Sequence, residues 1–291
     1  MRSRATTGWV VCALQSVSLA CSHVTPAALA TSSATGVEVE PAPEDVARAL
    51  DLEGVHNVRD LGGLRGARGI IPPGRFLRAA TLTHATSADR DALFARGVRH
   101  DIDLRTLFER AEASDTISHD SRFHYEHISL FGADIADWLH ATSLHFLYDD
   151  ALAHHQGSFR HVFHVLATQQ DGGVLFHCTS GKDRTGLVTA LVLDLAGVDR
   201  RTIVRDYAIS SHYLRRTLDP DTRSQGTSSP PSAIEHFLDA VDTRYGGTYA
   251  YLLQTGLPEA EIQELLARLG QTFRGDPLSY RSHRPDTIAR E

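Results

Sequence analysis

The sequence predicts an α/β domain in which helices cover a central, largely parallel β-sheet. Short apolar stretches of strand length alternate along the chain with longer stretches whose apolar residues recur at helical spacing. One short stretch, residues 174–176, runs into a glycine-containing turn and then into an apolar helix over residues 187–195. Open α/β sheets bind their ligands at turns of this kind, at the carboxyl ends of strands. We therefore expect the functional site at this turn.

The chain of 291 residues, 42% of them hydrophobic, is long enough to bury a substantial core in one domain. We expect this domain over residues 44–272. A signal peptide at residues 1–30 and a flexible leader at residues 31–43 are expected before it, and a polar tail at residues 273–291 after it.

The first thirty residues have the features of a secretory signal peptide. Arg2 and Arg4 precede an apolar stretch from Trp9 to Ala20, and Ala28-Leu29-Ala30 offers a small-x-small cleavage site. The apolar stretch is shorter than the roughly 20 residues that a membrane-spanning helix needs. We expect a secreted or periplasmic protein without stable membrane insertion, with an uncleaved membrane anchor or lipid attachment through Cys21 as the alternatives.

Composition and net charge narrow the classes of molecule that the protein is expected to bind. Loss of residues 1–30 would remove two arginines and no acidic residue, so the formal net charge would change from −7 to −9. Such an acidic chain is not expected to bind nucleic acid. Cys178 would remain as the only cysteine, and a single thiol in an exported protein indicates chemistry rather than a disulfide. The 17 histidines show no acidic pattern typical of metal sites, so we expect no metal and no cofactor.

The elements before the turn follow from apolar spacing and from helix caps. Ser87 is expected to cap a helix that runs through Arg96 and that Gly97 ends. Residues 135–168 carry apolar side chains at helical spacing and predict two or three helices. The other expected elements are a short helix over residues 44–50, a turn over residues 57–63 and strands over residues 76–79, 98–104 and 123–130.

The part of the chain that follows the turn is predicted to be helical. A stretch rich in Ser, Pro and Gly at residues 219–231 predicts a surface loop. The helices are expected over residues 184–196, 200–216, 232–243, 248–254 and 258–269.

The turn contains a cysteine and an arginine with five residues between them. Residues 177–186 read His-Cys-Thr-Ser-Gly-Lys-Asp-Arg-Thr-Gly. Backbone N–H groups of such a turn can surround a phosphate dianion, and the positive end of the following helix points at it. The same field stabilises a thiolate, so Cys178 should ionise below the ordinary thiol pKa of about 8.5. Arg184 can hold two phosphate oxygens with its planar guanidinium.

This pattern assigns roles within the turn. Cys178 is the expected nucleophile, and Arg184 with the backbone N–H groups would hold the phosphoryl oxygens in the transition state. His177 is expected to orient the turn through hydrogen bonds, and Thr185 to donate its hydroxyl to the departing sulfur. Lys182, the only lysine of the chain, would add a positive charge toward the rim. The expected phosphate-binding residues are Thr179, Ser180, Gly181, Lys182, Asp183 and Arg184.

Departure of the leaving group needs a proton donor, and the sequence leaves the donor open. Asp183 is the first candidate because it lies in the turn beside Arg184. Asp103 is the second, since it ends a strand that should neighbour the strand before the turn. Asp134 and Asp137 are the third. Both Asp183 and Asp103 could instead be structural partners of nearby arginines.

These motifs resemble cysteine-dependent protein tyrosine phosphatases, in particular the atypical bacterial secreted branch that includes mycobacterial protein tyrosine phosphatase B. Residues 177–186 are similar to the signature loop of that superfamily. Asn57-Val58-Arg59-Asp60-Leu61-Gly62-Gly63 resembles the branch's Asn-Phe-Arg-Asp-Leu-Gly-Gly motif, with Val58 where Phe is usual. Asp103-Leu104-Arg105 with Glu109 resembles its Asp-Leu-Arg…Glu strand end, and Asp206-Tyr207…Ser210…Tyr213-Leu214 a helical stretch.

The resemblance implies the protein tyrosine phosphatase fold and hydrolysis of phosphotyrosine, with phosphoserine and phosphothreonine as further substrates, through a phosphocysteine intermediate. It also implies that helices within residues 135–168 or 200–255 cover the pocket as a lid. The expected partner is a phosphorylated protein or a phosphoinositide, since Lys182 beside Asp183 suits a highly anionic head group. A phosphate-binding module without turnover is a further alternative, and a cysteine hydrolase or sulfurtransferase is a more remote one.

Overall fold

The computed structural model describes residues 39–131, 143–217 and 227–271. Outside the described residues lie the expected signal peptide, residues 31–38 of the expected leader, the expected tail, and Asp134 and Asp137.

A five-stranded sheet forms the centre of the domain and confirms the predicted α/β class. Its strands are β1 (Arg59–Asp60), β2 (Phe76–Ala79), β3 (Val98–Asp103), β4 (His124–His127) and β5 (Gly173–His177), in the order β1-β2-β5-β3-β4. All neighbouring strands are parallel except β1, which is antiparallel to β2. The strand that occurs last in the chain therefore lies in the middle, and the turn after β5 leaves the sheet beside the ends of β2 and β3.

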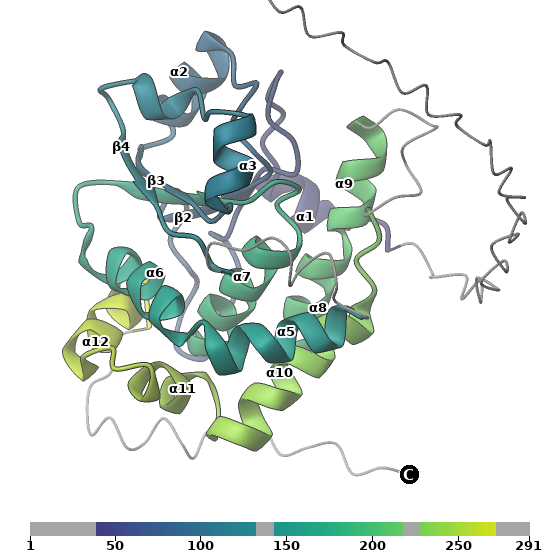
Figure 1. The fold of residues 1–291 in the computed structure, drawn as a ribbon, viewed down its shortest axis with the longest axis vertical. Coiled ribbons are helices and arrows are strands. Elements are labelled where there is room, and N and C mark those ends of the chain that lie inside the picture. The colour runs from purple at the N-terminus through teal and green to yellow at the C-terminus, as the bar shows by residue number, and fades with distance from the viewer. Residues whose placement is uncertain (1–38, 132–142, 218–226, 272–291) are drawn as a thin grey trace, which may run out of the picture. The chain divides into compact units, whose positions relative to one another are not determined.

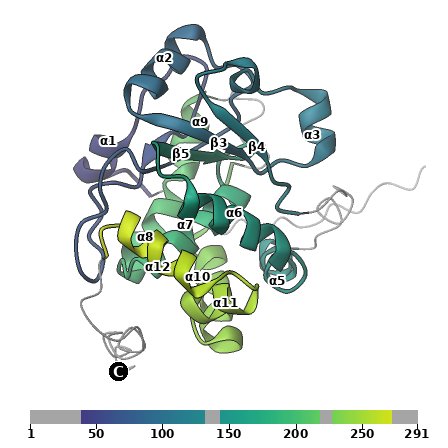
Figure 2. The same cartoon turned by 90° about the vertical axis from the view of Figure 1, so that its left-hand side faces the viewer.

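Helices lie on both faces of this sheet (Figures 1 and 2). On one face are α2 (Ser87–Ala95) and α3 (Leu107–Glu112), together with the short 3₁₀ helix η1 (Ile117–His119). The larger helical layer on the other face contains α6 (Gln156–Thr168), α7 (Asp183–Leu195), α8 (Arg200–Ala208), α10 (Pro231–Tyr245), α11 (Thr248–Gln254) and α12 (Glu259–Arg268). The remaining helices are α1 (Pro43–Arg48), α5 (Leu144–His154) and α9 (Ser210–Thr217).

Strand alternation divides the core between the two faces. Successive side chains of a strand point to opposite faces, so Phe76 and Phe176 pack with the larger helical layer, whereas Leu77 and Leu175 pack toward α2. α7 is buried on nearly all sides, in keeping with its largely apolar sequence. The helix that follows the turn is thus fixed on every side.

Three local predictions differ from the structure, and one helix was not predicted. Thr86, not Ser87, caps α2, because its side chain accepts a hydrogen bond from the Asp89 N–H. Residues 59–60, expected in a turn, pair with β2 as strand β1. α3 was not expected, since six residues are too few to show a helical period. The helix expected over residues 200–216 is divided at Ile209 into α8 and α9.

The break between α8 and α9 is caused by a side chain that is distant in sequence. The hydroxyl of Ser229 donates a 2.7 Å hydrogen bond to the carbonyl of Ala208. The N–H of His212, four residues further on, donates to the carbonyl of Ile209 instead. One turn of helix therefore loses its regular hydrogen bond.

Among the described residues, no helix has both the length and the apolar character needed to cross a membrane.

Candidate active site

The predicted turn, residues 178–182, connects the end of β5 to the first residue of α7. Gly181 is essential to its shape, because φ is +62° there and an added Cβ would lie 2.3 Å from the carbonyl oxygen of Ala79. The turn is thus pressed against the end of β2. The positive end of the 13-residue helix α7 lies directly behind it.

Cys178 is buried at the start of the turn. Burial by itself raises the pKa of the thiol, but the positive charge of Arg184 and the polar groups of the neighbouring Thr185 lower it more, so the net shift is downward. Such a shift favours the thiolate, which is the nucleophilic form of cysteine. The sequence-based expectation of an acidic thiol agrees with this environment.

Arg184 lies at the first turn of α7 and is held by a carboxylate from the opposite face of the sheet. Its two terminal nitrogens donate to the two oxygens of Glu109 on α3, at 2.5 and 2.7 Å. Burial raises the pKa of Glu109, but these hydrogen bonds outweigh it and bring that pKa to about 2. The Thr179 hydroxyl also donates to Glu109. Glu109 therefore fixes the guanidinium beside the thiol.

Lys182 and Asp183 are drawn into the protein rather than toward solvent. The ammonium of Lys182 donates to the carbonyl of Ser228 at 2.7 Å and lies 3.4 Å from the Asp183 carboxylate. The hydroxyl of Tyr148 on α5 donates to Asp183 at 2.7 Å. Only 4% of Lys182 is exposed, so its charge is not at the rim, where the sequence placed it, because Ser228 attracts it inward.

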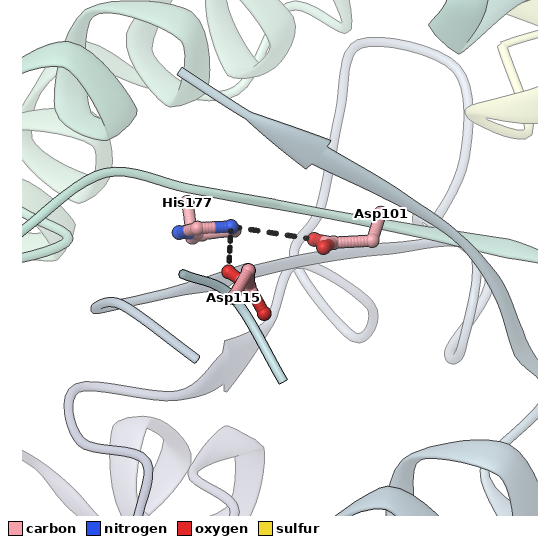
Figure 3. Close-up of side chains that lie close together, drawn as sticks. All are labelled: Asp101, Asp115 and His177. Atoms are coloured by element: carbon pink, nitrogen blue, oxygen red, sulfur yellow. Dashed lines mark ion pairs between the residues drawn. The ribbon is translucent and has the colours of Figure 1, made fainter. Parts of the chain in front are cut away.

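His177 lies beneath the turn in a fully buried group of charges (Figure 3). Its Nε2 is 3.0 Å from a carboxylate oxygen of Asp115 and 3.6 Å from one of Asp101, and its Nδ1 is 3.3 Å from the carbonyl of Cys178. Burial opposes protonation of the imidazole, but the negative charges of Asp101 and Asp103 raise its pKa well above the ordinary value. An imidazolium therefore supports the first residue of the turn from below.

Asp101, Asp115 and His177 also form the one group of side chains, within the described parts of the chain, whose ligand atoms could hold a metal ion. These atoms lie within 4.8 Å of one another. The positive charge of the His177 imidazolium already balances part of the carboxylate charge here. A resident metal is therefore not needed to account for the group.

Asp103, the second candidate for the proton donor, is paired with an arginine. Arg105 donates to both oxygens of Asp103, at 2.9 and 2.7 Å, and the Tyr125 hydroxyl donates at 2.9 Å. Burial raises the pKa of Asp103, but His177 and Arg105 outweigh it and hold that pKa far below the ordinary range. These contacts favour a role for Asp103 as a structural partner of Arg105 rather than as a proton donor, an alternative that the sequence had left open.

The turn has further partners that sequence reasoning did not connect to it. Asn57 and Arg78 donate to its carbonyl oxygens, and Asp206 on α8 binds Arg78. Asn57 and Asp206 were visible only as parts of the resemblance, and Arg78 carried no signal beyond its place in a predicted strand. Gly186 of α7 faces Tyr207 of α8, since an added Cβ would lie 2.8 Å from that ring.

Comparison with known proteins shows the family to which the chain belongs. The sequence model described as the tyrosine phosphatase family matches residues 50–271. A tyrosine-protein phosphatase of Nostoc commune is 45% identical over 223 residues, which cover 69% of this chain and 76% of that protein. The triple specificity protein phosphatase PtpB of Mycobacterium tuberculosis is 25% identical over 273 residues, covering 74% and 96%. A solved structure of P. aeruginosa TpbA in complex with pTyr covers 53% of this chain and 85% of its own, with 16% identity and a TM-score of 0.31.

Proposed function

We propose that this chain, which belongs to the tyrosine phosphatase family, hydrolyses phosphotyrosine through a phosphocysteine intermediate on Cys178. Family membership makes it a protein-tyrosine phosphatase; the intermediate and the roles of individual residues are the proposal. The observation that carries it is the buried, acidified thiol of Cys178 beside a guanidinium at the amino end of α7. That arrangement places a nucleophile and an oxyanion-binding group in one turn.

In the first step, the Cys178 sulfur attacks phosphorus and a P–S bond forms while the P–O bond to the tyrosyl oxygen breaks. The leaving oxygen takes a proton from a general acid. In the second step, water attacks phosphorus, the P–S bond breaks, and inorganic phosphate and the thiolate are released. The buried hydroxyl of Thr185 has no partner among the described residues, so in this proposal it donates to the sulfur and eases the departure of the thiolate.

The phosphoryl oxygens are bound by Arg184 and by the N–H groups of the turn. Glu109 holds the guanidinium of Arg184 through both terminal nitrogens, so little rearrangement is needed when the phosphate arrives. A fixed, preorganised positive group of this kind stabilises the charge of the transition state more than a mobile one does.

Asp183 is the proposed general acid. It lies one residue before Arg184, and the Tyr148 hydroxyl fixes its carboxyl group by donating to it. Asp103 has an architectural role in this proposal, because its two oxygens are occupied by Arg105 and its pKa is strongly lowered. A carboxyl group with so low a pKa carries no proton to donate near neutral pH.

The proposed substrates are phosphotyrosine proteins, with phosphoserine and phosphothreonine as further substrates. The name of the mycobacterial relative, a triple specificity phosphatase, supports this breadth. The buried ammonium of Lys182 lies against Ser228, which favours a simple phosphomonoester over a head group that carries several phosphates.

Export belongs to the same proposal. Arg2, Arg4 and the apolar stretch after them support a cleaved signal peptide, although they lie outside the described residues. Mass spectrometry of protein recovered outside the cytoplasm should show an amino terminus near residue 31. A mature protein that starts at Met1, or a lipid on Cys21, would contradict cleavage after Ala30.

The test of the mechanism is phosphate release from phosphotyrosine, phosphoserine, phosphothreonine and phosphoinositide substrates. Cys178→Ser should abolish release, because an alcohol of ordinary pKa replaces the thiolate. Arg184→Ala should lower kcat/KM by about 10³-fold, the size of effect seen when a transition-state charge partner is lost. Undiminished turnover by Cys178→Ser would falsify the mechanism, and preferred release from phosphoinositides would overturn the substrate assignment.

A further inference from the structure

We propose that Asn57, Arg78 and Asp206 are positioning residues that set the direction of the backbone N–H groups in the turn after β5. This inference rests on the proposed function, in which those N–H groups bind the phosphoryl oxygens. The three side chains reach the turn only through its carbonyl oxygens, at Ser180 and Gly181, or through one another. They act on catalysis by orienting peptide groups and not by touching the phosphate.

Two side chains hold the carbonyl oxygens of the turn. The amide nitrogen of Asn57 donates to the carbonyls of Ser180 and Gly181, at 3.0 Å each. Arg78, on the central part of β2, donates to the carbonyl of Gly181 at 2.8 Å. Both side chains are almost fully buried, so solvent does not compete for these hydrogen bonds.

Peptide geometry converts these contacts into a direction for the N–H groups. In a planar trans peptide, the C=O of one residue and the N–H of the next point in opposite directions. The carbonyl of Thr179 is held in the same way, by the backbone N–H of Thr81 at 3.1 Å. With three successive oxygens held by the scaffold, the N–H groups of residues 180–182 are turned away from that scaffold, toward the inside of the turn.

Asn57 is itself fixed in the orientation that this role needs. It is the one non-glycine residue with a positive φ, +57°, in the described part of the chain, and Asn tolerates this conformation better than most residues do. Its side-chain oxygen accepts a hydrogen bond from Arg59. The amide nitrogen must therefore face the turn.

Asp206 links Arg78, which contacts the turn directly, to Arg59, which contacts Asn57. Its carboxylate lies 2.5 Å from Arg78, 3.1 Å from Arg48 and 3.5 Å from Arg59, and all four side chains are buried. Burial raises the pKa of Asp206, but the three arginines hold it far below the ordinary range, so the carboxylate is charged. Without it, the guanidinium groups of Arg59 and Arg78 would repel each other beneath the turn.

The first experiment compares Asn57→Asp with Asn57→Gly. Asp replaces the amide donor by a carboxylate that repels both carbonyl oxygens, whereas Gly removes the donor and keeps the positive φ at low cost. We expect kcat/KM for p-nitrophenyl phosphate to fall about 100-fold in Asn57→Asp and about tenfold in Asn57→Gly, as small errors in positioning can cost on the order of 100-fold.

Two readouts separate positioning from a loss of stability. Inorganic phosphate should protect Cys178 from alkylation less well in both variants. In each variant, protection should weaken by a factor similar to its loss of kcat/KM. The pH midpoint of alkylation should also rise, since misdirected N–H groups no longer stabilise the thiolate. Asp206→Asn should show the same two changes wherever it folds; where it does not fold, the Asn57 variants decide.

Gln271→Glu is the matched control. Gln271 is a buried amide that donates to the backbone carbonyls of Gly69 and Leu269, so the substitution makes the same chemical change away from the turn. It should lower thermal stability and leave phosphate protection unchanged. Folded Asn57→Asp that behaves like Gln271→Glu would overturn the positioning role. An inactive parent protein, or an active Cys178→Ser, would instead overturn the proposed function.

Discussion

At the scale of single residues, neighbouring ionisable groups of the turn are shifted in opposite directions. The pKa of the Cys178 thiol is lowered and that of the His177 imidazole is raised, although the two residues are adjacent in sequence. Their side chains meet different charges: Arg184 lies beside the thiol, whereas Asp101 and Asp115 surround the imidazole. The acidic thiol could be predicted from sequence because its causes are local to the turn. The acidic surroundings of His177 could not, because they come from the packing of β3 and of the segment that precedes η1.

The proposed role of Asp183 predicts a dependence on the leaving group. Asp183→Asn should lower kcat by about 10²- to 10⁴-fold on phenyl phosphate, whose leaving group needs a proton, and far less on p-nitrophenyl phosphate. Asp171→Asn, which removes an exposed carboxylate paired with His100, is the control and should not distinguish the substrates. Equal losses on both substrates in Asp183→Asn would remove Asp183 as the general acid.

At the scale of elements, short segments hold the site and long ones support it. α3 has only six residues, yet its Glu109 both caps the helix, by accepting from the N–H of Thr106 at 2.8 Å, and binds Arg184. The long elements, such as α7, could be predicted because their apolar pattern extends over several turns. α3 and the two-residue strand β1 could not, since a capping box or a single strand pairing leaves no period in the sequence.

The break between α8 and α9 is another feature that could not be predicted from a local sequence pattern. A continuous helix is what the sequence of residues 200–216 predicts, and the break depends on Ser229, which is distant in sequence and donates to Ala208. The interruption matters for the site because Asp206 and Ser210 lie on either side of it, and both contact the arginine pair beneath the turn. Tertiary hydrogen bonds thus overrule local helical preference.

At the scale of the whole domain, the turn is supported from both faces of the sheet. Arg78 reaches Asp206 in the larger helical layer, whereas His177 meets Asp101 and Asp115 on the face of α2. The sequence could predict the sheet, the place of the turn at the carboxyl end of a strand and the lowered pKa of its thiol, because these follow from the order of elements and from one motif. It could not predict which distant charges would be brought together beneath the turn, because that depends on which face each strand residue occupies.

The buried group on the α2 face predicts how stability changes with pH. No hydrogen-bond donor reaches either oxygen of Asp101 among the described residues. Burial therefore raises the pKa of this carboxyl group above its ordinary value of 3.8, against the pull of the His177 charge. Between 3.8 and that raised pKa, the folded protein binds a proton that the unfolded chain has lost, so stability falls as pH rises through this interval.

Asp101→Asn should reverse this loss, because an amide stays neutral at every pH. At pH 4 to 5 the wild-type carboxyl is protonated and resembles the amide, so the two proteins should differ least there. Toward pH 8 the Tm of the variant relative to wild type should rise, with each unit of pKa shift worth about 1.4 kcal/mol. Asp171→Asn should change the Tm in the opposite direction. The His100 hydrogen bond lowers the pKa of Asp171, so the stabilisation by this carboxylate is present above pH 3.8. Its removal should therefore lower the Tm at neutral pH. Asp101→Asn that loses Tm relative to wild type on going from pH 5 to pH 8 would mean that the carboxylate is held in its charged form, with His177 as a full counter-ion.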